Sequence, residues 1–114
     1  MDIEVIPLDN NITCLRLQGR LDSAGVDRME VRFNAAAVAS GRNAVVDLSG
    51  VTFLASMGIR MLITGARALK GKGAVLVLFG AQELVQGVLE SVALDQVIPI
   101  AANQEEALAL LVAG

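Results

Sequence analysis

A serine stands where an apolar strand is expected to turn into a helix. Leu54 to Gly58 reads L-A-S-M-G, half of the G-x-S-x-G pattern that exposes a hydroxyl at a strand-to-helix corner. Such a hydroxyl can be a nucleophile, a modification site or the cap of the helix. A nucleophile needs a base, but the chain has no histidine, and Lys70 lies fourteen residues along the same helix, roughly 21 Å away. The sequence therefore argues against serine catalysis and leaves the other two roles of Ser56 open.

The remaining reactive side chains do not assemble into a known chemical site. The G-K-G segment at 71–73 lacks the spacing of a P-loop or a dinucleotide fingerprint, and its glycines are expected to end a helix. Cys14 falls inside a predicted strand, where we expect a small buried hydrophobe. The acids Asp22, Asp47 and Asp95 lie near element ends and show no paired-carboxylate spacing. We therefore predict a binding module without catalytic residues, metal ligands or cofactor.

Length and charge limit the classes of function. The chain has 114 residues, which fits one domain over 1–114. Residues 1–72 hold all nine Lys and Arg with seven acids, a net charge of +2, whereas residues 73–114 hold five acids and no base. No basic stripe with interleaved aromatic residues is present, so the sequence gives no support for nucleic-acid binding.

Hydrophobicity and cysteine usage indicate the compartment. Apolar residues make up 54% of the chain, but runs such as A-V-L-V-L-F at 74–79 are far shorter than the ~20 residues of a membrane span. The N-terminus has no basic region of the kind that opens a signal peptide. A single cysteine excludes an internal disulfide. We expect a cytoplasmic protein that does not insert into a membrane.

Strand and helix patterns alternate along the chain. Expected strands cover residues 3–8, 12–19, 43–49, 74–79 and 96–100. Expected helices cover residues 21–40, 57–69, 81–92 and 103–113. The D-N-N segment at 9–11 suits a hairpin turn, and the solidly apolar runs at 43–49 and 74–79 are typical of parallel strands covered on both faces. The order predicts a single-domain α/β fold: a mostly parallel mixed sheet with an N-terminal antiparallel hairpin and about four helices.

Periodicity and capping signals identify core positions and helix ends. The expected sheet core includes Val45, Val46, Leu48, Val75, Val77 and Leu78. The expected buried stripe of the helix at 57–69 is Ile59, Leu62, Ile63, Ala66 and Leu69, opposite Arg60, Thr64 and Arg67. Asp22 or Ser23 can cap the first helix and Asn103 the last. Gly41 is well placed to end the first helix.

Three segments together carry the pattern of a known family: G-R-L-D-S-A-G-V-D-R-M-E at 19–30, A-V-V-D-L-S-G-V-T-F-L-A-S-M-G-I-R-M-L at 44–62 and K-G-K-G-A-V-L-V-L-F-G at 70–80. They resemble the STAS domain, the fold of bacterial anti-sigma factor antagonists and of the cytoplasmic tails of sulfate transporters. The first is similar to the family's G-x-L-D turn, and the second to its D-L-S-G-V followed by F-x-D-S-S-G. The resemblance extends over nearly every element and implies a STAS-like fold.

The resemblance gives Ser56 a role. Ser56 occupies the position of the serine or threonine that a partner kinase phosphorylates, and Gly58 matches the motif's final glycine. Ala55 replaces the usual Asp, and Met57 replaces a small or hydroxylated residue. The resemblance implies an antagonist that binds an anti-sigma factor kinase when unphosphorylated, is switched off by phosphorylation and is reset by a phosphatase. The alternative is a structural or regulatory STAS subunit of a transporter or signalling complex that is never phosphorylated, which Ala55 and Met57 favour.

One partner-binding surface is expected around Ser56, where strands end and helices begin. Met57 and Met61 are expected as apolar contacts, and Arg60 lies four residues after Ser56 on one helix face. The predicted surface consists of Asp22, Ser23, Ser49, Ser56, Met57, Gly58, Arg60, Met61 and Arg67. If Ser56 is only the N-cap of its helix, this surface has no phosphorylation switch.

Overall fold

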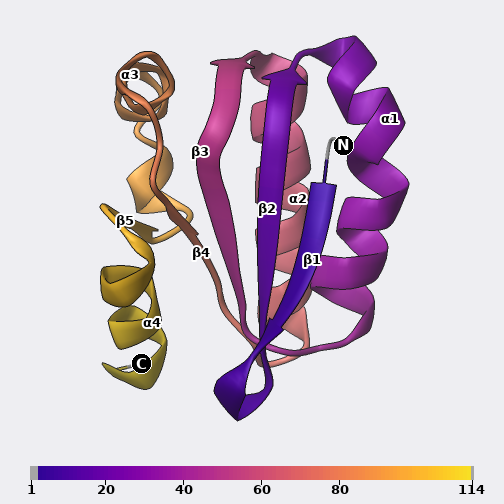
Figure 1. Cartoon of the computed structure of the whole chain (residues 1–114), viewed down its shortest axis with the longest axis vertical. Coiled ribbons are helices and arrows are strands. Elements are labelled where there is room, and N and C mark those ends of the chain that lie inside the picture. Colours follow the sequence, from indigo (N-terminus) through magenta and orange to yellow (C-terminus); the bar gives the residue numbers. More distant parts are fainter. Residues whose placement is uncertain (1–2, 114) are drawn as a thin grey trace.

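The computed structural model describes residues 3–113 and contains one five-stranded sheet (Figure 1). Its strands are β1 (Ile3–Leu8), β2 (Ile12–Leu21), β3 (Ala44–Leu54), β4 (Leu76–Phe79) and β5 (Ile100–Ala101). They lie side by side in the order of the sequence. β1 pairs with β2 antiparallel, and every later pair is parallel. The predicted hairpin and mixed sheet are confirmed.

Four α-helices connect or follow these strands. They are α1 (Ser23–Asn34), α2 (Ser56–Gly71), α3 (Glu83–Ser91) and α4 (Gln104–Ala113). α1 continues through a wider π turn over Ala35–Ala39, and Gly41 follows with a φ of 67°, a conformation that glycine adopts without strain. The predicted order of elements is therefore observed.

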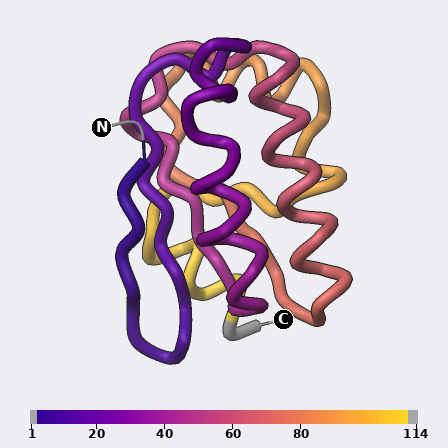
Figure 2. Tube along the Cα trace, turned by 90° about the vertical axis from the view of Figure 1, so that its right-hand side faces the viewer, coloured from indigo at the N-terminus to yellow at the C-terminus, as the bar shows by residue number. Residues whose placement is uncertain are grey.

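The helices divide unequally between the two faces of the sheet. Side chains of α1, α2 and α3 share one large core with the sheet, whereas α4 packs on a smaller cluster that contains Cys14, Val45 and Val77. α1 and α2 run next to each other along the covered face (Figure 2). α4 covers only part of the other face.

A row of charged side chains lies on that second face. Arg16 of β2 donates from Nε to Asp47 Oδ2 of β3 at 3.3 Å and from Nη1 to Glu4 Oε1 of β1 at 3.4 Å. These three residues are neighbours in the strand register. Because each carboxylate has a charged partner, Asp47 can be buried at this position.

Two core predictions need correction. Val75 is 43% exposed and precedes β4: its N–H is bonded to Asn43 Oδ1 at 2.9 Å, and sheet pairing begins at the next residue. Leu62 is fully buried as predicted, but Ile59 and Ile63 are only half-buried.

The predicted strand at 96–100 is also wrong over most of its length. Leu94–Gln96 forms a 3-10 turn, and β5 contains only Ile100 and Ala101. The N–H of Ile98 donates to Leu94 O at 2.9 Å, so a helical turn uses the backbone that the strand would need.

Candidate functional site

The carboxyl edge of the sheet is uneven. Its longest part carries the turn from β3 into α2 that contains Ser56, which we call the serine corner. β4 pairs with β3 only as far as Asp47, but β3 continues to Leu54 and pairs with the end of β2. The pairing shifts register between Arg16 and Gln18 and again between Gly19 and Arg20. β2 and β3 therefore project beyond β4 as a two-stranded extension.

Ser49 lies inside β3, not at its end as predicted. Its N–H donates to Asp47 Oδ1 at 2.9 Å, and its carbonyl accepts from Gln82 Nε2 at 2.6 Å. Gln82 immediately precedes α3. The backbone of Ser49 thus ties the start of α3 to β3, while its side chain is exposed.

The turn from β3 into α2 is fixed by main-chain hydrogen bonds. The N–H of Ala55 donates to Leu21 O at 3.0 Å, and the N–H of Ile59 donates to Ala55 O at 3.1 Å. Ala55 is therefore the N-cap of α2, and no side chain bonds to the helix end there. Ser56 is the first helical residue and is exposed. The hypothesis that Ser56 is only an N-cap is wrong.

Gly58 explains the spacing of the serine motif. A Cβ at this position would lie 2.7 Å from Leu21 O and 2.8 Å from Leu54 Cδ1. Such contacts are shorter than packed atoms tolerate, so only glycine lets the first turn of α2 approach the ends of both strands. Gly58 is buried, and its part in the predicted surface is to place Ser56, not to contact a partner.

The two methionines of the predicted surface differ. Met57 is 39% exposed beside Ser56, whereas Met61 is 2% exposed in the main core. The prediction that Met61 contacts a partner is therefore wrong. The buried stripe of α2 includes Met61 and Gly65, so the helix is rotated slightly from the orientation that its isoleucines suggested.

Asp22 lies between the end of β2 and the start of α1. It is the N-cap of α1, and its Oδ1 accepts from the N–H of Gly25 at 2.9 Å. Its Oδ2 accepts from Arg20 Nε at 3.1 Å. These two donors, the Gly25 N–H first, hold the pKa of Asp22 below its ordinary value. The next residue, Ser23, is exposed.

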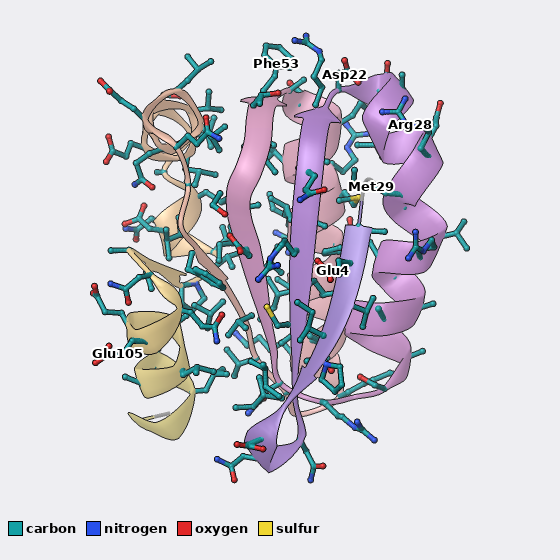
Figure 3. The ribbon with its side chains drawn as sticks, in the orientation of Figure 1. Glu4, Asp22, Arg28, Met29, Phe53 and Glu105 are labelled. Atoms are coloured by element: carbon teal, nitrogen blue, oxygen red, sulfur yellow. The ribbon has the colours of Figure 1, made fainter. Side chains whose placement is uncertain are left out.

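Arg20 makes a second contact, which the sequence did not predict. The guanidinium carbon of Arg20 lies 4.2 Å from the centre of the Phe53 ring, close enough for a cation–π interaction. Arg20 and Phe53 are direct neighbours across the β2–β3 pair. Asp22 and Phe53 lie near each other at the same end of the sheet (Figure 3). The shifts of register make this pairing hard to deduce from periodicity.

Arg60 and Arg67 lie along α2 after Ser56 and are exposed as predicted. Within residues 3–113, the ion pairs involve Arg16 and Arg20 but not these two arginines. α2 contains no acidic residue. The outer face of α2 therefore carries Arg60 and Arg67 with no compensating acid on the helix.

Other features bear on cofactor and membrane predictions. Cys14 is buried, and this burial, reinforced by Asp47, raises the pKa of its thiol, the opposite of the shift that activates a cysteine. Among residues 3–113, no group of His, Cys, Asp and Glu has the arrangement of a metal site. No helix in this part of the chain is long and apolar enough to cross a membrane.

A family model for the STAS domain matches residues 5–107. The chain therefore belongs to the STAS domain family, as the motifs around Gly19, Asp47 and Ser56 predicted. Membership of this family agrees with the prediction of a regulatory module and not an enzyme. A comparison with curated proteins gave no match.

Solved structures support the same fold. An anti-sigma-factor antagonist (STAS) domain protein from Planctomyces limnophilus is 28% identical, with a TM-score of 0.83 over 96% of this chain and 97% of that one. A candidate anti-sigma factor antagonist from Thermotoga maritima reaches a TM-score of 0.86 at 16% identity, over 96% of this chain and 93% of that one.

The antagonist SpoIIAA is similar in two solved states. Its unphosphorylated form has a TM-score of 0.69 at 16% identity, over 98% of each chain. The phosphorylated form from Bacillus has a TM-score of 0.67 at 17% identity, over 94% of this chain and 96% of that one. At these identities the likeness to SpoIIAA and to the Thermotoga protein establishes the fold alone.

Proposed function

We propose that this chain is an anti-sigma factor antagonist controlled by phosphorylation at Ser56. The unmodified form binds an anti-sigma factor kinase, and a phosphatase restores this form after modification. In the modification step, the γ-phosphoryl group of a nucleoside triphosphate moves to Ser56 Oγ, while the nucleoside diphosphate and the hydroxyl proton leave. The observation that carries the proposal is the exposed Ser56 at the first position of α2, on a rigid corner of a STAS fold.

The position of Ser56 suits a phosphate that changes a surface without unfolding the domain. Phosphorylation adds about −1.5 to −2 charges. The first N–H groups of a helix have no partner within the helix, and its dipole favours an anion there. No side-chain cap occupies this end of α2. The modified domain is therefore expected to keep its fold and to present a strongly altered charge.

The proposed partner surface surrounds this corner. Met57 offers a flexible apolar contact next to Ser56, and Arg60 and Arg67 extend the surface along α2. Asp22 and Ser23 border it at the start of α1. Ser49 contributes an exposed side chain lower on β3. A cytoplasmic location and the kinase and phosphatase partners belong to this proposal and rest on the sequence and the family.

The second candidate is a subunit that binds its partner permanently. Ala55 has no side-chain acceptor for the N-cap position of α2. It also lacks the carboxylate that the family pattern has beside Ser56. A kinase that recognises this carboxylate would not modify Ser56. The same surface would then serve a constant contact with a transporter or signalling complex.

Paired substitutions at Ser56 separate the two candidates. The partner is first captured from cells of the source organism with the unmodified chain, and Ser56 is examined by mass spectrometry. We expect Ser56→Glu to weaken binding strongly, because it adds a charge at the corner, and Ser56→Ala to keep binding. Ser40→Glu is the matched control. Ser40 is exposed and follows the C-terminal end of α1, whereas the proposed surface lies at the N-terminal end of that helix. If both Ser56 variants bind as wild type and no phosphate is found, the permanent-subunit function replaces the switch.

A further inference from the structure

The side chain of Arg20 is held beside the serine corner by two weak contacts. Its Nε donates to Asp22 Oδ2 at 3.1 Å, and its guanidinium lies over the Phe53 ring at 4.2 Å. The side chain is still 59% exposed. A guanidinium has five N–H donors, and within residues 3–113 Arg20 uses only Nε as a donor. Most of its hydrogen-bonding capacity therefore faces solvent.

The ion pair with Asp22 can open without loss of the helix cap. Asp22 caps α1 through Oδ1, which accepts from the N–H of Gly25 at 2.9 Å, whereas Arg20 bonds only to Oδ2. An exposed ion pair of this kind contributes little to stability. Arg20 can therefore exchange Asp22 for a stronger anion while α1 stays in place.

The backbone brings Arg20 close to Ser56. Leu21, the residue after Arg20, accepts a hydrogen bond from Ala55, the residue before Ser56, at 3.0 Å. Arg20 and Ser56 each lie one residue away from this bond. Two Cα–Cα steps plus the spacing between neighbouring strands keep the Cα atoms of Arg20 and Ser56 within about 12 Å of each other. Leu21 is in the core shared with α2, so Arg20 points to the opposite face of the sheet, and its side chain spans this gap by turning over the end of the strand.

Close packing fixes both sides of this gap. A Cβ on Gly25 would lie 1.9 Å from Arg20 O, and one on Gly58 would lie 2.7 Å from Leu21 O. The starts of α1 and α2 thus both press against the end of β2. The main chains of Arg20 and Ser56 are held in place, and only their side chains need to move.

We propose that Arg20 is the phosphate sensor of this site: it pairs with Asp22 and Phe53 in the unmodified chain and turns to the phosphate in the chain modified at Ser56. The inference rests on the proposed function and extends it from the modified residue to the residue that responds. Arginine suits this role because its planar fork binds phosphate through two parallel hydrogen bonds. Its departure uncovers the Phe53 ring and frees Asp22 Oδ2, so a partner meets changes at three side chains besides Ser56.

Arg60 is the competing ligand for the same phosphate. It lies four residues after Ser56 on α2, and long helical side chains point toward the N-terminus of their helix. Arg60 makes no ion pair within residues 3–113, whereas Arg20 is already oriented by an aromatic ring and a carboxylate. Because an exposed ion pair contributes little to stability, exchanging Asp22 for the more strongly charged phosphate costs Arg20 little, and the experiment compares the two arginines directly.

The test uses the full chain with phosphoserine inserted at position 56 during translation. The pKa of the phosphate, ordinarily about 6, is measured by phosphorus NMR in the Arg20→Gln, Arg20→Lys and Arg60→Gln variants and with both arginines present. An opposite charge in contact shifts a pKa by about 1–3 units, and exposure reduces the shift. We expect Arg20→Gln to raise the phosphate pKa by about 0.5–1 unit, Arg20→Lys to raise it by less, and Arg60→Gln to leave it unchanged.

Two results would overturn the inference: a rise with Arg60→Gln but not with Arg20→Gln, or no rise with either variant. The first would assign the phosphate to Arg60 and the second to the helix end alone. Because the phosphoserine is inserted without a kinase, this result is independent of the proposed function. If Ser56 is never modified in cells, the proposed function fails while the contact between Arg20 and the phosphate can still be observed.

Discussion

Helices α2 and α3 cover the same face of the sheet, yet their glycines have opposite roles. In α2, a Cβ on Gly58 would collide with Leu21 and Leu54, and one on Gly65 would lie 2.7 Å from Phe33 Cε2. In α3, a Cβ on Gly87 would meet no described atom within 4 Å. Glycine is therefore required for close approach at positions 58 and 65 of α2 but not at position 87 of α3.

This difference shows how the site is kept rigid. α2 touches the main chain of β2 at its first turn and the ring of Phe33 further along. α3 is shorter, and only its Val85 and Leu89 side chains are buried. The helix that carries Ser56 is thus held at a fixed distance from Arg20 and Asp22, while α3 has fewer constraints on its position.

The largest expected effect is the loss of a core side chain of α2. Leu62 is fully buried, so Leu62→Ala should lower the free energy of unfolding by about 2–5 kcal/mol. The matched control is Leu84→Ala on α3, where the side chain is 65% exposed and the change should stay within about 0.5 kcal/mol. Urea denaturation of both variants measures the difference. Equal losses would contradict the contrast between the two helices.

Much of the fold could be predicted because buried apolar residues recur in the sequence at the period of a helix or a strand. The hairpin, the parallel strands and four helices follow from apolar spacing and turn residues. The prediction failed where local hydrogen bonds compete with that spacing. Val75 belongs to an apolar run, but its N–H is bonded to Asn43; Ile98 has its N–H bonded within a turn. Neither bond can be read from hydrophobicity.

The serine corner was predictable, but its surroundings were not. Ser56 is recognisable because its motif is local in the sequence. Met61 was misplaced because a small rotation of α2 moves a side chain from the surface into the core. Arg20 was missed because its pairing with Phe53 depends on two shifts of strand register. Such contacts depend on long-range geometry.

An intermediate effect is expected when the glycines of the two helices are changed alike. Alanine favours a helix more than glycine does, by about 1 kcal/mol, so Gly87→Ala should stabilise the domain by about 0.5–1 kcal/mol. Gly58→Ala should instead destabilise it by about 1–3 kcal/mol, because the new methyl group forces the helix away from Leu21 O. Thermal and urea unfolding report both changes. A gain for both variants would show that the first turn of α2 can shift freely.

The smallest expected effect comes from the helix starts, where neither helix has a side-chain cap. Ala55 and Gln82 are the N-caps of α2 and α3, and both have extended backbone conformations. Ala55→Asp should stabilise the domain by about 0.5–1 kcal/mol, because the carboxylate can accept from free N–H groups of the first turn. Gln82→Asp is the control and should gain less, since it loses the bond from Gln82 Nε2 to Ser49 O. Urea denaturation above pH 6, where the new carboxylates are ionised, measures both. No gain from Ala55→Asp would mean that this end of α2 does not attract an anion, which would remove the electrostatic reason for a phosphate at Ser56.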